Sequence, residues 1–355
     1  MSLAEFVEQV ARIALFAVLI YFVFPLGNKG VLAGVSMTLG CFVSMSFMII
    51  VYFAMKRKLS NPRGHYKEVV TSALPITGVR TATSLIQPLI AVLFPFMLVL
   101  SGHTTEQAMS LYGIAMGMAL PLLFLPSTIV GAMSFTLIPD LSVSVAQKNN
   151  IQIVQKIRSN VFFATLISVL FIPFYIGAGN EICTFLYDNA LAGVYLRRSA
   201  IIMLPLGLSN ITSSILNALN LEVKSFVHNI IGGGVLILCI ISLSWLMGVD
   251  ALILGFLLCM TITTLLNIIM IKKQTKMSLG ILKPLFLMLC FVTLSAVLCR
   301  FLCGVLCNCV GMFWGLAISC ISCVASFVVL CWTFKLLDVV GLLCRFLPKK
   351  LKKSE

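Results

Sequence analysis

The chain has 355 residues, of which 60% are hydrophobic and only 10% are charged, and its mean hydropathy is +1.11. These values exclude a soluble globular domain, which needs a solvated polar surface. The net charge of +14 comes largely from basic residues gathered in a few connections, so it predicts membrane topology and not nucleic-acid binding.

Apolar runs dominate the chain, and about 20 residues are enough for a helix to cross a bilayer. None of the runs alternates as a strand of a membrane barrel would. We therefore predict an all-α polytopic membrane protein with about ten transmembrane helices. The runs cover residues 6–24, 31–55, 73–100, 108–138, 161–182, 195–217, 226–247, 251–271, 285–303 and 312–334.

The first run opens with acidic residues, whereas a secretory signal peptide opens with basic ones. Glu5, Glu8, Gln9 and Arg12 share one helix face, and Glu8 can pair with Arg12 one turn away. This pattern fits an interfacial helix start with an internal ion pair, or else a face that lines a cavity.

Arg80 is the single charged residue of the third run. An arginine at the centre of a membrane helix costs roughly 2.5 to 3.5 kcal/mol, so it normally faces a wet cavity, a partner or a ligand. Thr77, Ser84 and Gln87 would lie on the same face of the helix and extend it as a polar stripe. These four residues are candidates for substrate binding.

Prolines interrupt the third and fourth runs. An interior proline removes a backbone hydrogen bond and clashes with the preceding turn, so these helices should kink or break, and Pro139 should end the fourth. Broken helices at membrane depth line cavities and mark hinges or substrate sites in transporters, although a kink can also serve packing alone. The candidate hinge residues are Pro75, Pro88, Pro121 and Pro126.

The sixth run carries a second polar stripe, formed by Asn210, Ser213, Asn217 and Asn220 at helical spacing. Amides and hydroxyls suit sugar hydroxyls, and they suit hydrogen bonds between helices slightly better. Asn217 is retained as a further candidate for substrate binding.

Thirteen cysteines lie mostly within the runs, where small residues favour close helix packing. The three histidines lie near run ends, so no metal site is predicted. The sequence contains no HExxH, no GxSxG and no ATP-binding motif, so we expect neither an enzyme nor a cofactor.

Most of the 25 lysines and arginines lie after the second, fourth, sixth and eighth runs or in the C-terminal tail. Basic residues concentrate in cytoplasmic loops. Both termini are therefore predicted to be cytoplasmic, and the tail can also attract anionic lipids.

The stretch from Glu106, EQAMSLYGIAMGMALPLLFLPSTIVGAMSFTLIPDLSVSVA, resembles a segment of the stage V sporulation protein B group. This group belongs to the multidrug/oligosaccharidyl-lipid/polysaccharide exporter superfamily. Three further stretches resemble the group in the same order: EFVEQVARIA near the start, SALPITGVRTATSLIQP at 72–88 and ILNALNLEVKSFVHNIIGG at 215–233. Arg80 matches an arginine that the group carries after its proline.

Members of this family have two pseudo-symmetric lobes of six helices, usually followed by two more helices. The resemblance implies that residues 1–58 are a two-helix remnant of the N-terminal lobe, whose first four helices are missing. Residues 59–275 would form the complete C-terminal six-helix lobe. Residues 276–355 would add two helices and the basic cytoplasmic tail.

The resemblance also implies a flippase of the bacterial plasma membrane. Such a protein moves a lipid-linked cell-wall or polysaccharide precursor to the outer leaflet, here in peptidoglycan synthesis for the spore cortex. The partner would be an anionic lipid-linked oligosaccharide of the undecaprenyl-pyrophosphate type, and the planar fork of Arg80 suits phosphate oxygens.

Two alternatives remain open. A cation-coupled multidrug exporter would need a carboxylate within a span, yet the acidic residues lie at span ends, in loops or in the tail. A truncated remnant, or a partner subunit that does not transport by itself, would explain the missing helices.

Overall fold

The computed structural model describes residues 2–23, 29–54, 77, 81, 83–275 and 282–334. Within these ranges every regular element is a helix, and nine helices are long and apolar enough to cross a membrane. The predicted class of all-α polytopic membrane protein is confirmed. The chain divides into two compact units, Met1–Ser72 and Ala73–Glu355, which we describe separately.

The first unit pairs helix α1 (Ser2–Val23) with helix α2 (Lys29–Ala54). Arg12 on α1 forms the predicted ion pair with Glu8 and also lies 3.5 Å from Cys41 Sγ on α2. Gly40 allows this approach, because a Cβ atom there would overlap the Arg12 side chain. The polar face of α1 therefore contacts the neighbouring helix.

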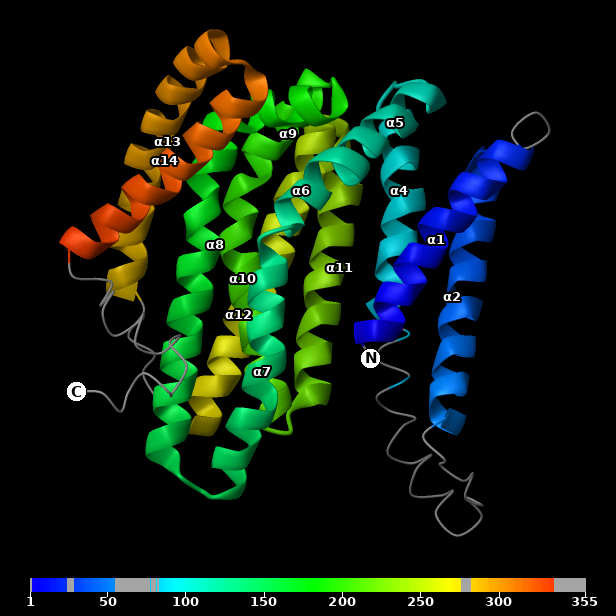
Figure 1. Ribbon diagram of the computed structural model, residues 1–355. Coiled ribbons are helices and arrows are strands. Elements are labelled where there is room, and N and C mark those ends of the chain that lie inside the picture. Colours follow the sequence, from blue (N-terminus) through cyan, green and yellow to red (C-terminus); the bar gives the residue numbers. More distant parts are fainter. Residues whose placement is uncertain are drawn as a thin grey trace. The chain divides into compact units, whose positions relative to one another are not determined.

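The second unit is an array of helices that follow one another up and down the bundle (Figure 1). Together with α1 and α2, each of the ten predicted runs holds one helix or a series of consecutive helices. The helices are α4 (Ile86–Leu100), α5 (Thr105–Tyr112), η2 (Gly113–Ala119), α6 (Leu120–Phe124), α7 (Ser127–Ala146), α8 (Asn150–Tyr187), α9 (Ala190–Ser199), η3 (Ala200–Ile202), α10 (Met203–Ala218), α11 (Glu222–Met247), α12 (Val249–Thr275), α13 (Leu282–Val310) and α14 (Met312–Thr333).

Two helices extend further than the apolar pattern predicts. The sequence places the end of the fourth run at Pro139, but α7 continues through this proline to Ala146, so that prediction is wrong. Helix α8 has 38 residues and is about 57 Å long at 1.5 Å per residue, nearly twice the thickness of a bilayer core. Polar residues can continue a helix beyond the membrane, so hydropathy alone underestimates helix length.

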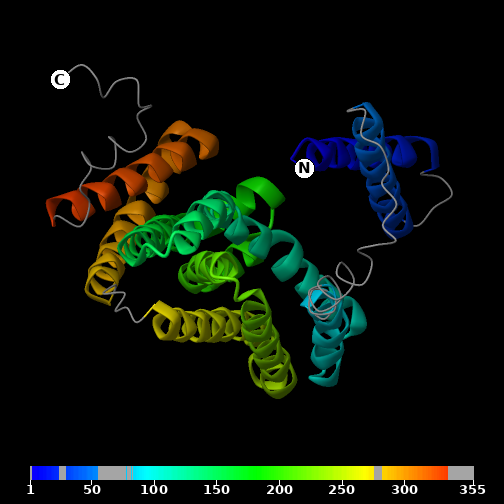
Figure 2. The same cartoon turned by 90° about the horizontal axis from the view of Figure 1, so that it is seen from below.

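Helix α8 is the centre of the second unit. It packs against α7, α9, α10, α13 and α14, and Figure 2 shows α13 and α14, in orange, beside the green α8. Its contact with α13 is close, because a Cβ atom on Gly177 would lie 2.8 Å from Cys299 Cβ and 3.0 Å from the Ala296 carbonyl oxygen. Cys299 is fully buried and, like all described cysteines, is a free thiol.

The predicted boundaries after residues 58 and 275 both adjoin segments outside the described residues. The division into a lobe remnant, a complete lobe and two extra helices stays a prediction.

Candidate functional site

The residues predicted from the third run are only partly described. Arg80 and Pro75 lie outside the described residues. Thr77, Ser84 and Gln87 are all exposed, which places them on the surface of the second unit and not in its core. Substrate binding by these residues stays a prediction.

Helix α4 has one packed face and one open face. Ile90, Phe94 and Leu98 are fully buried, and Ile86 fits against Gly233 of α11. Pro88 is exposed in the first turn of α4.

Thr83 and Ser84 are also helical, and the turn at Leu85 separates them from α4, so the missing N–H of Pro88 leaves the Ser84 carbonyl without its usual helical donor. A hinge role for this interruption stays a prediction.

The fourth run forms a helix with two interruptions, which we call the broken helix: α5, η2, α6 and α7. The first interruption is a π-helical segment, Gly113–Ala119, in which the Leu120 N–H bonds the Ala115 carbonyl five residues back. Pro121 follows directly and cannot donate to the carbonyl of Gly117. A local widening of the helix accommodates this lost bond, as π-bulges do in other helices.

The second interruption is a turn at Leu125 and Pro126. In a regular helix, the N–H of residue 126 would bond the Leu122 carbonyl, but proline has no N–H. The buried Tyr175 of α8 donates its hydroxyl to this carbonyl at 2.7 Å, and the Leu125 N–H adds a longer bond of 3.3 Å. The break is therefore stabilised by a side chain from another helix.

Two side-chain hydroxyl groups donate hydrogen bonds to backbone carbonyls at the same break. Ser127 Oγ donates to the Phe124 carbonyl at 2.7 Å, and Thr128 Oγ1 donates to the Leu125 carbonyl at 2.7 Å. A broken helix in hydrocarbon requires such partners for its freed carbonyls. The interruptions at Pro121 and Pro126 are thus built features of the fold, while their role as a hinge stays a prediction.

One face of the broken helix is open and lined by small or polar residues. Pro121 and Ser110 are exposed, and a Cβ atom on Gly113 or Gly117 would have no neighbour within 4 Å. A groove of about 460 Å³ lies at the α5 end of this face. It is lined by His103, Glu106, Gln107, Ser110, Leu111, Ile114 and Leu191.

The open face offers hydroxyl, amide and carboxylate groups next to accessible backbone. Such groups form hydrogen bonds with the hydroxyls and amides of a sugar headgroup. In the part of the chain that is described, no cluster of His, Cys, Asp or Glu could hold a metal ion.

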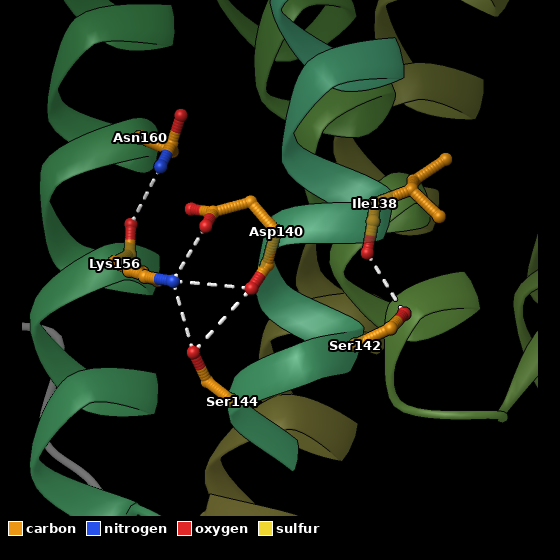
Figure 3. Close-up of polar contacts among 6 residues, drawn as sticks. All are labelled: Ile138, Asp140, Ser142, Ser144, Lys156 and Asn160. Carbon is orange, nitrogen blue, oxygen red and sulfur yellow. Dashed lines mark hydrogen bonds and ion pairs between the residues drawn. The ribbon is translucent and has the colours of Figure 1, made fainter. Parts of the chain in front are cut away.

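Beyond the break, α7 is anchored to α8 by a polar clamp (Figure 3). Lys156 Nζ contacts the Asp140 carboxylate at 2.7 Å, the Asp140 backbone carbonyl at 3.1 Å and Ser144 Oγ at 2.9 Å. Ser142 Oγ adds a bond of 3.4 Å to the Ala218 carbonyl at the end of α10. This half of the broken helix is thereby attached to two neighbours.

The second polar stripe divides between two environments. Ser213 accepts a hydrogen bond of 3.0 Å from Asn267 on α12, so it joins helices. Asn217 is half-buried and Asn220 is exposed in a turn with a positive φ of 59°. Substrate binding by Asn217 stays a prediction.

Sequence reasoning did not identify Tyr175, the partner of the broken helix. A usable signal exists, because a tyrosine hydroxyl buried in an apolar span needs a hydrogen-bond acceptor. A proline-freed carbonyl is one such acceptor, but the two residues are 53 positions apart.

Comparison with known proteins gives one relative in sequence and one in structure, while no family model matches. The chain is 23% identical over 295 residues to Stage V sporulation protein B of Bacillus subtilis (strain 168), covering 79% of this chain and 57% of that protein. It is similar in fold to Lipid II flippase MurJ in an inward closed conformation, with a TM-score of 0.59 and 13% identity. That match covers 94% of this chain and 66% of the flippase.

The similarity in sequence confirms the resemblance to the stage V sporulation protein B group. The similarity in structure shows a shared fold. The chain spans less than two thirds of the length of each of these proteins.

Proposed function

We propose that this chain is a flippase component that moves a lipid-linked cell-wall or polysaccharide precursor to the outer leaflet of the bacterial plasma membrane. The observation that carries this proposal is the broken helix. Its freed carbonyls are satisfied within the unit, its small and polar face is open, and it belongs to a fold shared with a lipid II flippase. The similarity to a sporulation protein supports a role of this kind in spore formation.

The proposed substrate has an anionic undecaprenyl-pyrophosphate headgroup. Arg80 would bind phosphate oxygens through its guanidinium group, because arginine forms paired, charge-assisted hydrogen bonds with phosphate. Thr77, Ser84 and Gln87 would orient the headgroup, and Asn217 would contact its sugar. Moving each negative charge outward gains roughly 2.3 kcal/mol per 100 mV of inside-negative potential, so no ATP site is needed.

The proposed orientation places the α7–α8 and α10–α11 connections in the cytoplasm, together with both termini. Figure 1 shows these two connections at the same end of the second unit. Lys148 lies in the first connection, and Arg158 on α8 and Lys224 on α11 lie in the helices that follow the two connections. Basic residues favour the cytoplasmic side.

The direct test is a lipid-flipping assay with the full chain in vesicles, comparing the wild type with Arg80→Ala. We expect at least a tenfold loss of translocation, since one charge-assisted contact of about 1.5 kcal/mol or more changes binding by that factor. Arg300→Ala is the matched control, because Arg300 is an exposed arginine within another apolar helix. Equal losses in both variants, or none in Arg80→Ala, would refute the proposed site.

The same assay separates the alternatives. Translocation that appears only after a second chain is added, carrying the part of the Bacillus relative that this chain does not match, would identify a partner subunit. Efflux of a cationic dye without lipid translocation would identify a multidrug exporter.

A further inference from the structure

The groove at the α5 end of the broken helix, which we call the α5 groove, has a mixed lining of polar and apolar side chains. Its volume of about 460 Å³ lies within the usual range of ligand pockets, roughly 300 to 1,000 Å³. The polar lining comes from His103 in the α4–α5 turn and from Glu106, Gln107 and Ser110 on α5. The groove is therefore large enough for a ligand of one or two sugar rings.

The apolar part of the lining comes from two helical segments. Leu111 and Ile114 follow Gln107 on the same helix face, one and two turns further along. Leu191 adds a side chain from α9, which packs against the π-helical segment. Aliphatic side chains suit the C–H surface of a sugar ring, while polar groups beside them suit its hydroxyls.

The polar groups of the α5 groove are little used by the fold itself. The side chains of His103, Glu106 and Ser110 are exposed and make no hydrogen bond or ion pair with any residue that the structure describes. Gln107 accepts a bond of 3.2 Å from the Thr104 N–H through Oε1, so its amide nitrogen can donate to a ligand. The groove thus offers donors and acceptors without the loss of a protein contact.

The charge of the lining favours a neutral ligand over an anionic one. Glu106 supplies a carboxylate, and the described residues that line the groove include no lysine or arginine. A carboxylate accepts hydrogen bonds from hydroxyl and amide groups, whereas it repels a phosphate. The groove is therefore suited to a sugar, in contrast to Arg80, which suits phosphate oxygens.

The α5 groove lies on the outer side of the membrane in the proposed orientation. Figure 1 shows α5 at the end of the second unit opposite to the α7–α8 and α10–α11 connections. We propose that this groove binds the sugar of the lipid-linked precursor after translocation. Because Glu106 repels the pyrophosphate, the groove holds the sugar without its charged link, which favours release. This inference rests on the proposed function.

The first test is binding of N,N′-diacetylchitobiose, a neutral disaccharide, to the full chain labelled with ¹⁵N in its histidine rings. The His103 signal, assigned by its loss in His103→Gln, should shift as the sugar is added, because the ring lines the groove. Inorganic pyrophosphate should leave this signal unchanged. A signal that does not move with the sugar, or that moves equally with pyrophosphate, would overturn the proposal.

Titration of the same signal measures the contribution of the carboxylate. Glu106→Ala should weaken sugar binding by about tenfold, the effect of one hydrogen bond to a charged group. Glu222→Ala is the matched control and should bind like the wild type, because Glu222 is also an acidic residue in the first turn of its helix, at the other end of the unit. Equal affinities in Glu106→Ala and Glu222→Ala would refute the site.

The second test asks whether translocation uses the groove. Ser110→Trp places a large side chain in the groove and should slow the flipping of the lipid-linked precursor in vesicles. Met109→Trp is the matched control, because Met109 is exposed on the same helix and does not belong to the described lining. Equal rates in the two variants would contradict a role after translocation.

The two proposals fail in distinguishable ways, because sugar binding requires no transport. A wild type that binds the sugar beside His103 but moves no lipid would refute the proposed function and keep the sugar site. A wild type that moves lipid, with no sugar binding beside His103, would refute the sugar site and keep the proposed function.

Discussion

Helix α8 and the broken helix respond differently to proline. Pro173 lies inside α8, and the helix continues without interruption for 38 residues. Pro121 and Pro126 interrupt the broken helix twice within six residues. Each proline removes one N–H group, so the missing hydrogen bond alone does not explain the difference.

The surroundings of the two helices do explain it. Pro173 is buried, and α8 is packed against five other helices, which resist any bend. Pro121 is exposed, and the face on which it lies is open at Gly113 and Gly117.

Exposure alone does not decide the outcome, because Pro126 is buried at its break and Pro139 is exposed within the continuous α7. What distinguishes the break at Pro126 is a substitute donor from another helix, the Tyr175 hydroxyl.

The largest effect should come from replacing a closely packed glycine with alanine. The same replacement at a glycine with open space beside it is the comparison. Gly177→Ala in α8 should destabilise the protein by about 1–3 kcal/mol, because its new Cβ atom would press against Cys299 and the Ala296 carbonyl. Gly117→Ala in the broken helix should be neutral or stabilising by up to about 1 kcal/mol, since the space there is empty. Thermal unfolding in detergent measures both, and equal destabilisation would contradict the comparison.

A smaller effect should follow from removing the hydroxyl that stabilises the break. Tyr175→Phe should cost about 0.5–1.5 kcal/mol, because the Leu122 carbonyl keeps only its longer bond to the Leu125 N–H. Pro126→Ala restores the helical N–H donor. The effect of Tyr175→Phe should therefore shrink in the Pro126→Ala background.

A double-mutant cycle on thermal stability measures this coupling between Tyr175 and Pro126. Additive effects would show that the tyrosine hydroxyl does not serve the carbonyl freed by the proline. Tyr112→Phe is a suitable control, since Tyr112 precedes the π-helical segment and packs near Phe94.

The smallest effect should come from the clamp between α7 and α8. Lys156→Met should cost about 0.2–1 kcal/mol, because the Asp140 side chain is 61% exposed and water screens the ion pair. The loss should decrease at high salt, which can be followed by thermal unfolding between low and high ionic strength. A loss that does not change with salt would indicate that the Ser144 and carbonyl contacts, and not the ion pair, hold the clamp.

Several features of the fold could be predicted from the sequence. Most of the predicted helical spans follow from apolar runs, because a bilayer core accepts little else, and nine helices within the described residues are long and apolar enough to cross it. The Glu8–Arg12 pair follows from helical spacing alone. The polar extensions of α7 and α8 could not be predicted from hydropathy, because they lie outside the apolar runs.

The candidate site was predictable only in part. Two prolines in one apolar run indicated a broken helix, and the same reasoning wrongly ended that helix at Pro139. The sequence left both a sugar and a neighbouring helix open as partners of Ser213, and its contact with Asn267 shows the second. Which partner such a side chain binds depends on residues that are distant in the sequence.

The sequence by itself determined the class of protein, the places of most apolar helices and the positions of the prolines, because these depend on local composition and on covalent structure. The tertiary structure decided which prolines break a helix and which polar groups face one another. A proline always removes the same donor, but the cost of that loss depends on packing and on partners supplied by other helices. For Pro126, that partner is Tyr175.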